Sequence, residues 1–305
     1  MDNVSTAYCS TLSLEAGEDL FGTASHAKVY FLLEYHGIWG VKAFQESDLP
    51  DVVKSRLSTC LADIPGSKLL LIKGFAAQAE SGPRFFIASA SEHEPRLYGF
   101  QLQGYQDLLS LDIHSLLDGS SAYEAARIYD PLYLVCTNGH RDVCCARYGS
   151  PVYLDLLKTS ISSVWQSTHM GGHRFAANLL CLPHGIQYGR LDAGQAQAVL
   201  ESHRAGKLDL DHYRGRTCYP EAVQAAEYYL RRQTGVLDLD AYHLREAQEG
   251  ANGEWQVTFA LRQAGQAYRL CIAMESTGVQ IRESCRSEKT SPLVRKRLVE
   301  FQELD

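Results

Sequence analysis

The chain has 305 residues, of which 45% are hydrophobic and 21% charged, with a net charge of −7. Such a composition is typical of a globular protein that can bury its own core, and the length corresponds to about two domains. The acidic balance argues against nucleic acid as the main ligand, because phosphate binding needs a surplus of lysine and arginine. The N-terminus has neither the basic nor the apolar region of a signal peptide, and no apolar run approaches the ~20 residues of a membrane span. We therefore expect a cytoplasmic protein that binds neither membrane nor nucleic acid.

The first part of the chain has the pattern of an α/β unit. Residues 1–27 predict a loosely structured lead-in. Continuous apolar runs then predict strands, and apolar residues at helical spacing predict helices. In chain order, the predicted elements are strand 27–35, helix 48–64, strand 68–75, hairpin strands 84–91 and 96–103, and helix 106–117.

A similar order recurs after residue 125. The predicted elements are strand 131–135, helix 145–160, strand 163–167, a helical turn at 175–178, hairpin strands 179–182 and 186–191, and helix 193–204. This is the order of a thioredoxin-like domain. The recurrence leaves open that the first half is a degenerate copy without the candidate site described below.

The last part of the chain has a different texture. The predicted elements are helix 219–233, alternating strands at 255–262, 267–274 and 278–283, and a closing amphipathic helix at 292–302. The pattern indicates a small antiparallel β extension that ends in a helix. We expect three domains, 1–124, 125–235 and 236–305, in an overall α/β (α+β) fold.

Nine cysteines are spread along the chain. Without a secretory signal, a disulfide framework is not expected, and most of these thiols should be small buried apolar groups. The group Cys136, Cys144 and Cys145 is too dense for that interpretation. Cys136 ends a predicted strand, where open α/β folds place ligands, and the cysteine pair begins the next helix, whose amides favour thiolates.

The second unusual segment is WQSTHMGGHRFAANLL, which places His169 and His173 four residues apart around two glycines. Two adjacent glycines disfavour a continuous helix, so we expect a loop whose backbone can approach a bulky inorganic group. Two soft thiolates with two imidazoles suit either zinc or an iron–sulfur cluster. The arrangement is not that of a Rieske centre, because here cysteine is paired with cysteine and histidine with histidine.

These residues resemble the sucrase/ferredoxin-like family, relatives of thioredoxin-like ferredoxins in which a Cys-x3-Cys pair has become His-x3-His. The similarity covers most of residues 20–235. The stretches that carry it are GTASHAKVYFLLEYHGIWG, CTNGHRDVCC, HMGGHRFAANLL, the YGR of residues 188–190 and YRGRTCYPEAVQAAEYYLR.

The resemblance implies a thioredoxin-like fold and a [2Fe-2S] cluster with two cysteine and two histidine ligands. By motif position the ligands are Cys136, Cys145, His169 and His173. The second thiolate stands three residues after the aspartate of the RD pair, which selects Cys145 over Cys144, the second choice. The implied protein is a non-enzymatic electron carrier with a pH-dependent potential that works with a redox partner protein, such as a flavin reductase.

Two other functions stay open from the residues alone. The first is a zinc-binding structural or interaction protein, because His-x3-His fits zinc spacing, although Cys-x8-Cys is longer than the usual knuckle. The second is a thiol enzyme with Cys145 as nucleophile and one of the two histidines as base. The sequence indicates neither the electron donor nor the oligomeric state.

Overall fold

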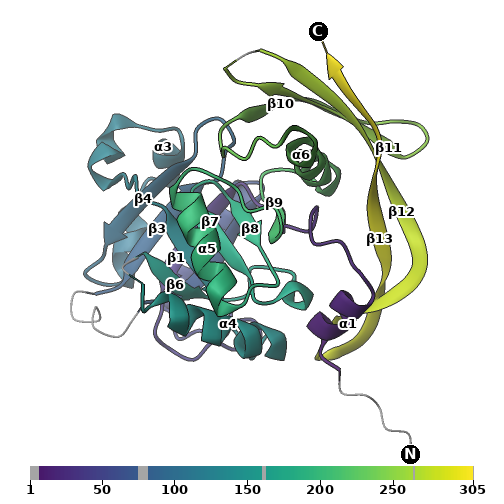
Figure 1. The fold of residues 1–305 in the computed structure, drawn as a ribbon. Helices are drawn as coiled ribbons and strands as arrows, with labels where there is room; N and C mark the ends of the chain where they lie inside the picture. Colours follow the sequence, from purple (N-terminus) through teal and green to yellow (C-terminus); the bar gives the residue numbers. More distant parts are fainter. Residues whose placement is uncertain (1–6, 75–81, 160–162, 264, 305) are drawn as a thin grey trace, which may run out of the picture.

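The computed structural model describes residues 7–74, 82–159, 163–263 and 265–304. They form a mixed α/β structure with a nine-stranded sheet and a separate four-stranded antiparallel sheet (Figure 1). The strand order of the large sheet is β4-β3-β1-β2-β6-β5-β7-β8-β9. None of the helices in the described part of the chain has the length and apolarity to cross a membrane.

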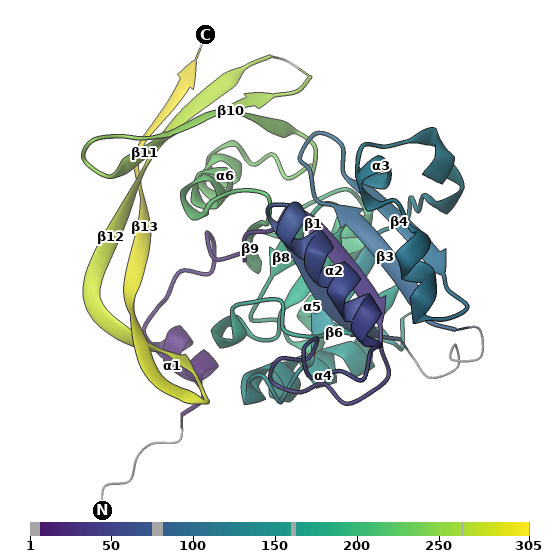
Figure 2. The same cartoon turned by 180° about the vertical axis from the view of Figure 1, so that it is seen from behind.

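The first half supplies four strands of the large sheet. β1 (Val29–Glu34) is parallel to β2 (Ser67–Lys73) and antiparallel to β3 (Arg84–Ser89), which pairs with β4 (Arg96–Gln101). The helix α2 (Asp51–Asp63) joins β1 to β2 and lies in front of this half in Figure 2. The predicted helix over 106–117 is instead the 3-10 helix η2 (Tyr105–Ser110) followed by α3 (Ile113–Leu117), and η3 (Ser121–Ala126) leads on.

The second half supplies the other five strands. β5 (Leu132–Cys136) is parallel to β6 (Val164–Ser167) and antiparallel to β7 (Leu179–Leu182), which pairs with β8 (Ile186–Tyr188). α4 (Val143–Leu156) joins β5 to β6, α5 (Ala193–Arg204) follows β8, and β9 (Tyr213–Arg216) forms the edge. The predicted strands and the two predicted helices of this half are therefore present, whereas the helical turn predicted at 175–178 is instead a 3-10 turn at 173–175. The predicted ends at residues 75 and 160 lie outside the described residues.

The two halves have the same strand order, β2-β1-β3-β4 and β6-β5-β7-β8, with the same relative directions. They meet where Ile72 and Lys73 of β2 pair antiparallel with Ser167 and Gln166 of β6. One buried apolar cluster contains side chains from both halves, and Cys136 and Cys145 belong to it. The first two predicted domains therefore share one sheet, and the candidate cysteines lie in its interior.

The third part of the chain packs on α6 (Glu221–Thr234). Its sheet has the order β10 (Tyr242–Glu249), β11 (Glu254–Leu261), β12 (Ala267–Ser284) and β13 (Ser287–Leu304). The long β12–β13 hairpin reaches α1 (Cys9–Glu15), a short helix within the predicted loose lead-in (Figures 1 and 2).

The predicted closing helix over 292–302 is wrong, because those residues belong to β13. A bulge between β12 and β13 explains the misleading pattern. Cys271 pairs with Glu300 and Ile272 with Leu298, so Val299 is an extra residue. The bulge changes the phase of the strand, and both Leu298 and Phe301 pack on the core beside α6. Their spacing of three mimics helical periodicity.

Candidate metal centre

Three of the four residues selected from the sequence meet at the carboxyl ends of two central strands of the large sheet. Cys136 is the last residue of β5, Cys145 lies in the first turn of α4, and His169 follows β6. Because β5 and β6 are parallel neighbours, with Cys136 opposite Ser167, their carboxyl ends lie side by side. The donor atoms of the three residues lie within 4.8 Å of one another, and Cys145 Sγ is 3.6 Å from His169 Nδ1.

The two thiols differ in their electrostatic surroundings although both are buried. Hydrogen bonds from Cys145 and His169 and from the backbone amide of Met170 hold the pKa of Cys136 well below its usual range, against the effect of burial. The neighbouring Cys136 and burial raise the pKa of Cys145. The pair therefore favours one thiolate and one shared proton, and a bound cation would displace that proton.

His173 begins the 3-10 helix η4 (His173–Phe175) and lies next to this group rather than within it. Its ring centre is 5.1 Å from that of His169. Its Nε2 contacts the carbonyl oxygen of Glu283 and lies 3.8 Å from Asp142 Oδ2, whereas its Nδ1 is buried without a partner in the described structure. We assign the proton to Nε2, because only a donor satisfies the carbonyl; this leaves the Nδ1 lone pair free. Burial lowers the pKa of His173, which favours this neutral form.

The loop between the two histidines needs its glycines for a reason that the sequence did not reveal. Gly171 and Gly172 have φ of 108° and 70°, a region that side chains other than glycine rarely adopt. A Cβ on Gly171 would collide with Ser25, and one on Gly172 would lie 2.2 Å from an Arg214 nitrogen. The glycines thus allow an unusual turn and the close approach of Arg214.

Two cations, the partly buried Lys68 and the fully buried Arg214, hold the loop carbonyls. Lys68 Nζ donates to the Met170 oxygen at 2.9 Å, and burial lowers the pKa of Lys68 to about 8. Arg214 donates to the Gly171 oxygen at 3.1 Å and to Asn178 Oδ1 at 2.7 Å. Asn178 in turn donates to the Gly172 oxygen at 2.9 Å. These contacts fix the backbone that carries both histidines.

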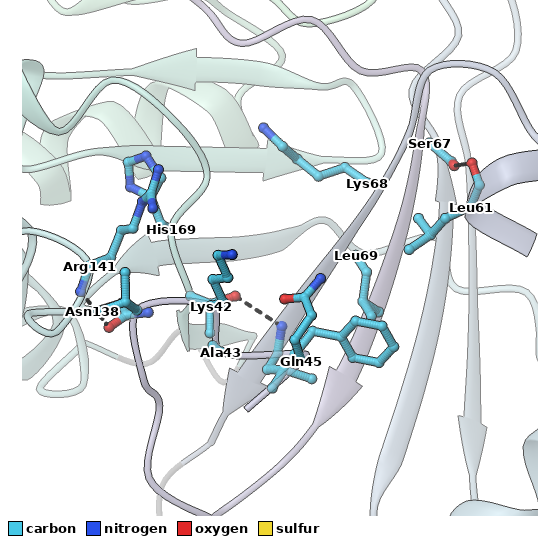
Figure 3. A pocket seen from close by; sticks show the side chains of 14 residues that line it. Lys42, Ala43, Gln45, Leu61, Ser67, Lys68, Leu69, Asn138, Arg141 and His169 are labelled. Carbon is cyan, nitrogen blue, oxygen red and sulfur yellow. Dashed lines mark hydrogen bonds between the residues drawn. The ribbon is translucent and has the colours of Figure 1, made fainter. Parts of the chain in front are cut away.

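A cavity of about 470 Å³ lies beside His169 (Figure 3). Lys42, Lys68 and Arg141 contribute to its lining, and among the described residues that line it there is no aspartate or glutamate. Arg141 and Lys42 are exposed, whereas Lys68 is partly buried. The surroundings of His169 are therefore open on one side and positively charged.

Cys144 points to a different place from Cys145. Its sulfur lies 3.5 Å from Cys9 Sγ and 3.4 Å from Cys285 Sγ. Hydrogen bonds from Cys9 and Ser10 lower the pKa of Cys144 to about 6, although burial opposes this. Adjacent residues of α4 thus serve two separate groups of donors, and the structure places Cys145, not Cys144, beside Cys136.

Two charged residues near these groups have structural partners. Asp142 accepts from the amide of Cys144 at 2.9 Å and so caps the start of α4. Arg174 donates to both carboxylate oxygens of Glu18 at 2.9 Å, so it forms a structural ion pair. Sequence reasoning did not select Lys68, Cys9 or Cys285, because no local motif links them to the site. Arg214 lies in the YRGR stretch, and that resemblance was a usable signal for it.

Comparison with known proteins identifies the family of the chain. The sequence model of the family described as Sucrase/ferredoxin-like matches residues 7–215. Altered inheritance of mitochondria protein 32 of Meyerozyma guilliermondii is 32% identical over 107 residues, which are 32% of this chain and 38% of that protein. The chain thus matches less than two fifths of the length of that relative, and no solved structure matches it. Since the family match covers well over half of the sequence, the chain belongs to the sucrase/ferredoxin-like family.

Proposed function

We propose that this protein is an electron carrier that holds a [2Fe-2S] cluster on Cys136, Cys145, His169 and His173. The observation that carries the proposal is the convergence of two thiols and an imidazole on one point, with a second imidazole beside them. Each pair lies at or after the carboxyl end of one of two adjacent parallel strands, so one small inorganic group could contact both pairs.

The donor set fits a two-iron group better than a single ion. A two-iron cluster binds one ligand pair on each iron, so its four donor atoms need not all lie in one coordination sphere. This agrees with the position of His173, outside the compact group of three but next to His169. The unpartnered buried Nδ1 of His173 is the nitrogen we assign to iron. Its Nε2–H donates to the Glu283 carbonyl, the kind of contact that orients metal-binding histidines.

When bound, the cluster would supply reversible one-electron chemistry with a potential raised by its neutral imidazole ligands. The protein residues have other tasks. Lys68 and Arg214 hold the histidine loop, and the sheet interior keeps water from the two thiols. The shared strand order of the two halves supports a thioredoxin-like arrangement for each half, with donors for the cluster in the second half alone.

We further propose that a redox partner protein, such as a flavin reductase, approaches over the cavity beside His169. An imidazole that is half-buried at the edge of a cavity offers a shorter path than the buried thiols. The positive charges of Lys42 and Arg141 favour an acidic docking surface on that partner. The cytoplasmic location inferred from the sequence stays a prediction.

A mononuclear zinc site is the second candidate for the same residues. It is favoured because the donor atoms of Cys136, Cys145 and His169 lie within 4.8 Å of one another, as donors bound to one metal ion would. A thiol enzyme is less well supported, because Cys136 and Cys145 are only 1% and 0% exposed. A buried thiolate offers no room for substrate attack.

Anaerobic purification from cells grown with iron tests the proposal. We expect a coloured protein with iron and acid-labile sulfide in about equal amounts, about two of each per chain. Reduction with dithionite should produce an electron paramagnetic resonance signal of one unpaired electron per cluster. A colourless protein that contains zinc at this site and no sulfide would contradict the iron–sulfur proposal and favour zinc.

A further inference from the structure

A second group of donors lies where the N-terminal helix α1 meets the turn of the β12–β13 hairpin. Cys9 of α1, Cys144 of α4 and Cys285 between β12 and β13 place their sulfurs within 4.8 Å of one another and of Asp142. The three cysteines come from segments more than a hundred residues apart, and all are free thiols. Figure 1 shows α1 beside the end of the β12–β13 hairpin.

The separations are close to those of a tetrahedral metal site. Zinc–sulfur bonds of about 2.3 Å place the sulfurs of a tetrahedron about 3.8 Å apart. Here the sulfur of Cys144 is 3.5 Å from Cys9 Sγ and 3.4 Å from Cys285 Sγ, and Cys9 Sγ is 3.8 Å from Asp142 Oδ1. Small movements of these side chains would bring the four donor atoms to the positions of zinc ligands.

The carboxylate is already oriented by hydrogen bonds. Asp142 Oδ1 accepts from the amide of Cys144 at 2.9 Å, and Oδ2 accepts from the Ser284 hydroxyl at 2.8 Å and the Cys285 amide at 2.9 Å. Partners of this kind fix the direction of a metal-binding carboxylate. Cys9, Cys144 and Asp142 are fully buried, whereas Cys285 is partly exposed and offers an entry path.

Ordinary packing does not explain this arrangement well. Three thiols and a carboxylate share one buried space, and a carboxylate is rarely buried without a cation or an ion-pair partner. The nearest histidine nitrogen, Nε2 of His173, is 3.8 Å from Asp142 Oδ2 and already contacts the Glu283 carbonyl. Soft thiolates together with one carboxylate favour zinc among the common divalent metals.

We propose that Cys9, Cys144, Cys285 and Asp142 form a structural zinc site. Zinc there cross-links the N-terminal helix, the start of α4 and the C-terminal hairpin. The hairpin also carries Glu283, whose carbonyl contacts His173. The site therefore holds the C-terminal sheet against the loop of the candidate cluster. The assignment does not depend on the identity of the group held by Cys136 and Cys145.

The test is metal analysis of the full-length protein, prepared under reducing conditions with zinc and iron in the medium. We expect about one zinc per chain in the wild type, and a zinc content at least tenfold lower in the double variant Cys9→Ser/Cys285→Ser. Cys271→Ser, which changes a partly exposed cysteine outside the group, is the matched control and should keep its zinc. Cys136→Ser/Cys145→Ser should also keep zinc while it loses iron.

A second measurement keeps the proposal testable if Cys9→Ser/Cys285→Ser does not fold. Cobalt(II) added to Cys136→Ser/Cys145→Ser should give the thiolate charge-transfer and tetrahedral absorption bands of a site with three sulfurs, and zinc should abolish both. Absence of these bands would overturn the proposal. So would zinc that disappears with Cys136 and Cys145 instead, or reduced wild-type protein that binds no zinc and forms a Cys144 disulfide in air.

Discussion

Replacement of one proposed histidine ligand by cysteine offers a quantitative test of how the iron site is built. We predict that His173→Cys retains a cluster, because Nδ1 lies close to the backbone and a cysteine sulfur reaches a similar position. The thiolate adds one negative charge to the site. We take about 5 Å as the distance between that charge and the electron added on reduction, a spacing like the 5.1 Å between the rings of His169 and His173. At an effective dielectric constant of about 20, two unit charges about 5 Å apart interact by about 3 kcal/mol.

That energy corresponds to a shift in the reduction potential of about 130 mV for a one-electron couple, and the shift is negative because added negative charge opposes reduction. A spectroelectrochemical titration at several pH values measures it. The potential of the variant should also depend less on pH, since one titratable imidazole has been removed. His140→Gln changes an exposed histidine between β5 and α4, outside the proposed ligand set, and should leave the potential unchanged. A His173→Cys protein with an intact cluster and the wild-type potential would refute the ligand assignment.

Three further predictions concern single residues. Cys145→Ser should lose the cluster iron, whereas Cys144→Ser, a change at the adjacent and equally buried position, should keep it; metal and sulfide analysis compares the two. Burial lowers the pKa of His203 to about 3, so its neutral form stabilises the fold above the ordinary pKa of about 6.5, and this stability is lost as the pH falls. Urea unfolding measures the free energy of unfolding at about pH 7 and pH 5. Between these pH values, His203→Leu should lose about 2 kcal/mol less of this free energy than the wild type. The control His114→Gln, at an exposed position, should lose as much as the wild type. Arg141→Glu should slow oxidation by ferricyanide several-fold at low salt and speed oxidation by a cationic cobalt(III) complex; equal effects on both oxidants would contradict electrostatic steering over the cavity.

Much of the large sheet could be predicted from local pattern. Continuous apolar runs such as Leu132–Cys136 are buried strands, and the helices between them have clear helical spacing. The pattern failed where pairing changed the local phase. The bulge at Val299 places Leu298 and Phe301 on one face of a strand, and no single-sequence period distinguishes this from a helix.

The candidate site was also predictable in part from local pattern. Cys136, Cys145 and His169 are close in sequence to the ends of two adjacent parallel strands, so local motifs bring them together. Lys68 and Arg214, which hold the histidine loop, come from a different half and from the edge strand. Cys9 and Cys285 are separated by almost the whole chain. Such long-range contacts depend on how the C-terminal hairpin folds back, which composition and spacing do not encode.

The central claim is that two thiols and two imidazoles bind a single two-iron group. Pulsed electron paramagnetic resonance on the dithionite-reduced protein labelled with ¹⁵N-histidine tests it most directly. We predict strong couplings from two histidine nitrogens on one iron, with one coupling lost in His173→Cys. A reduced cluster without coupled histidine nitrogens, or one whose couplings survive in His173→Cys, would contradict the account.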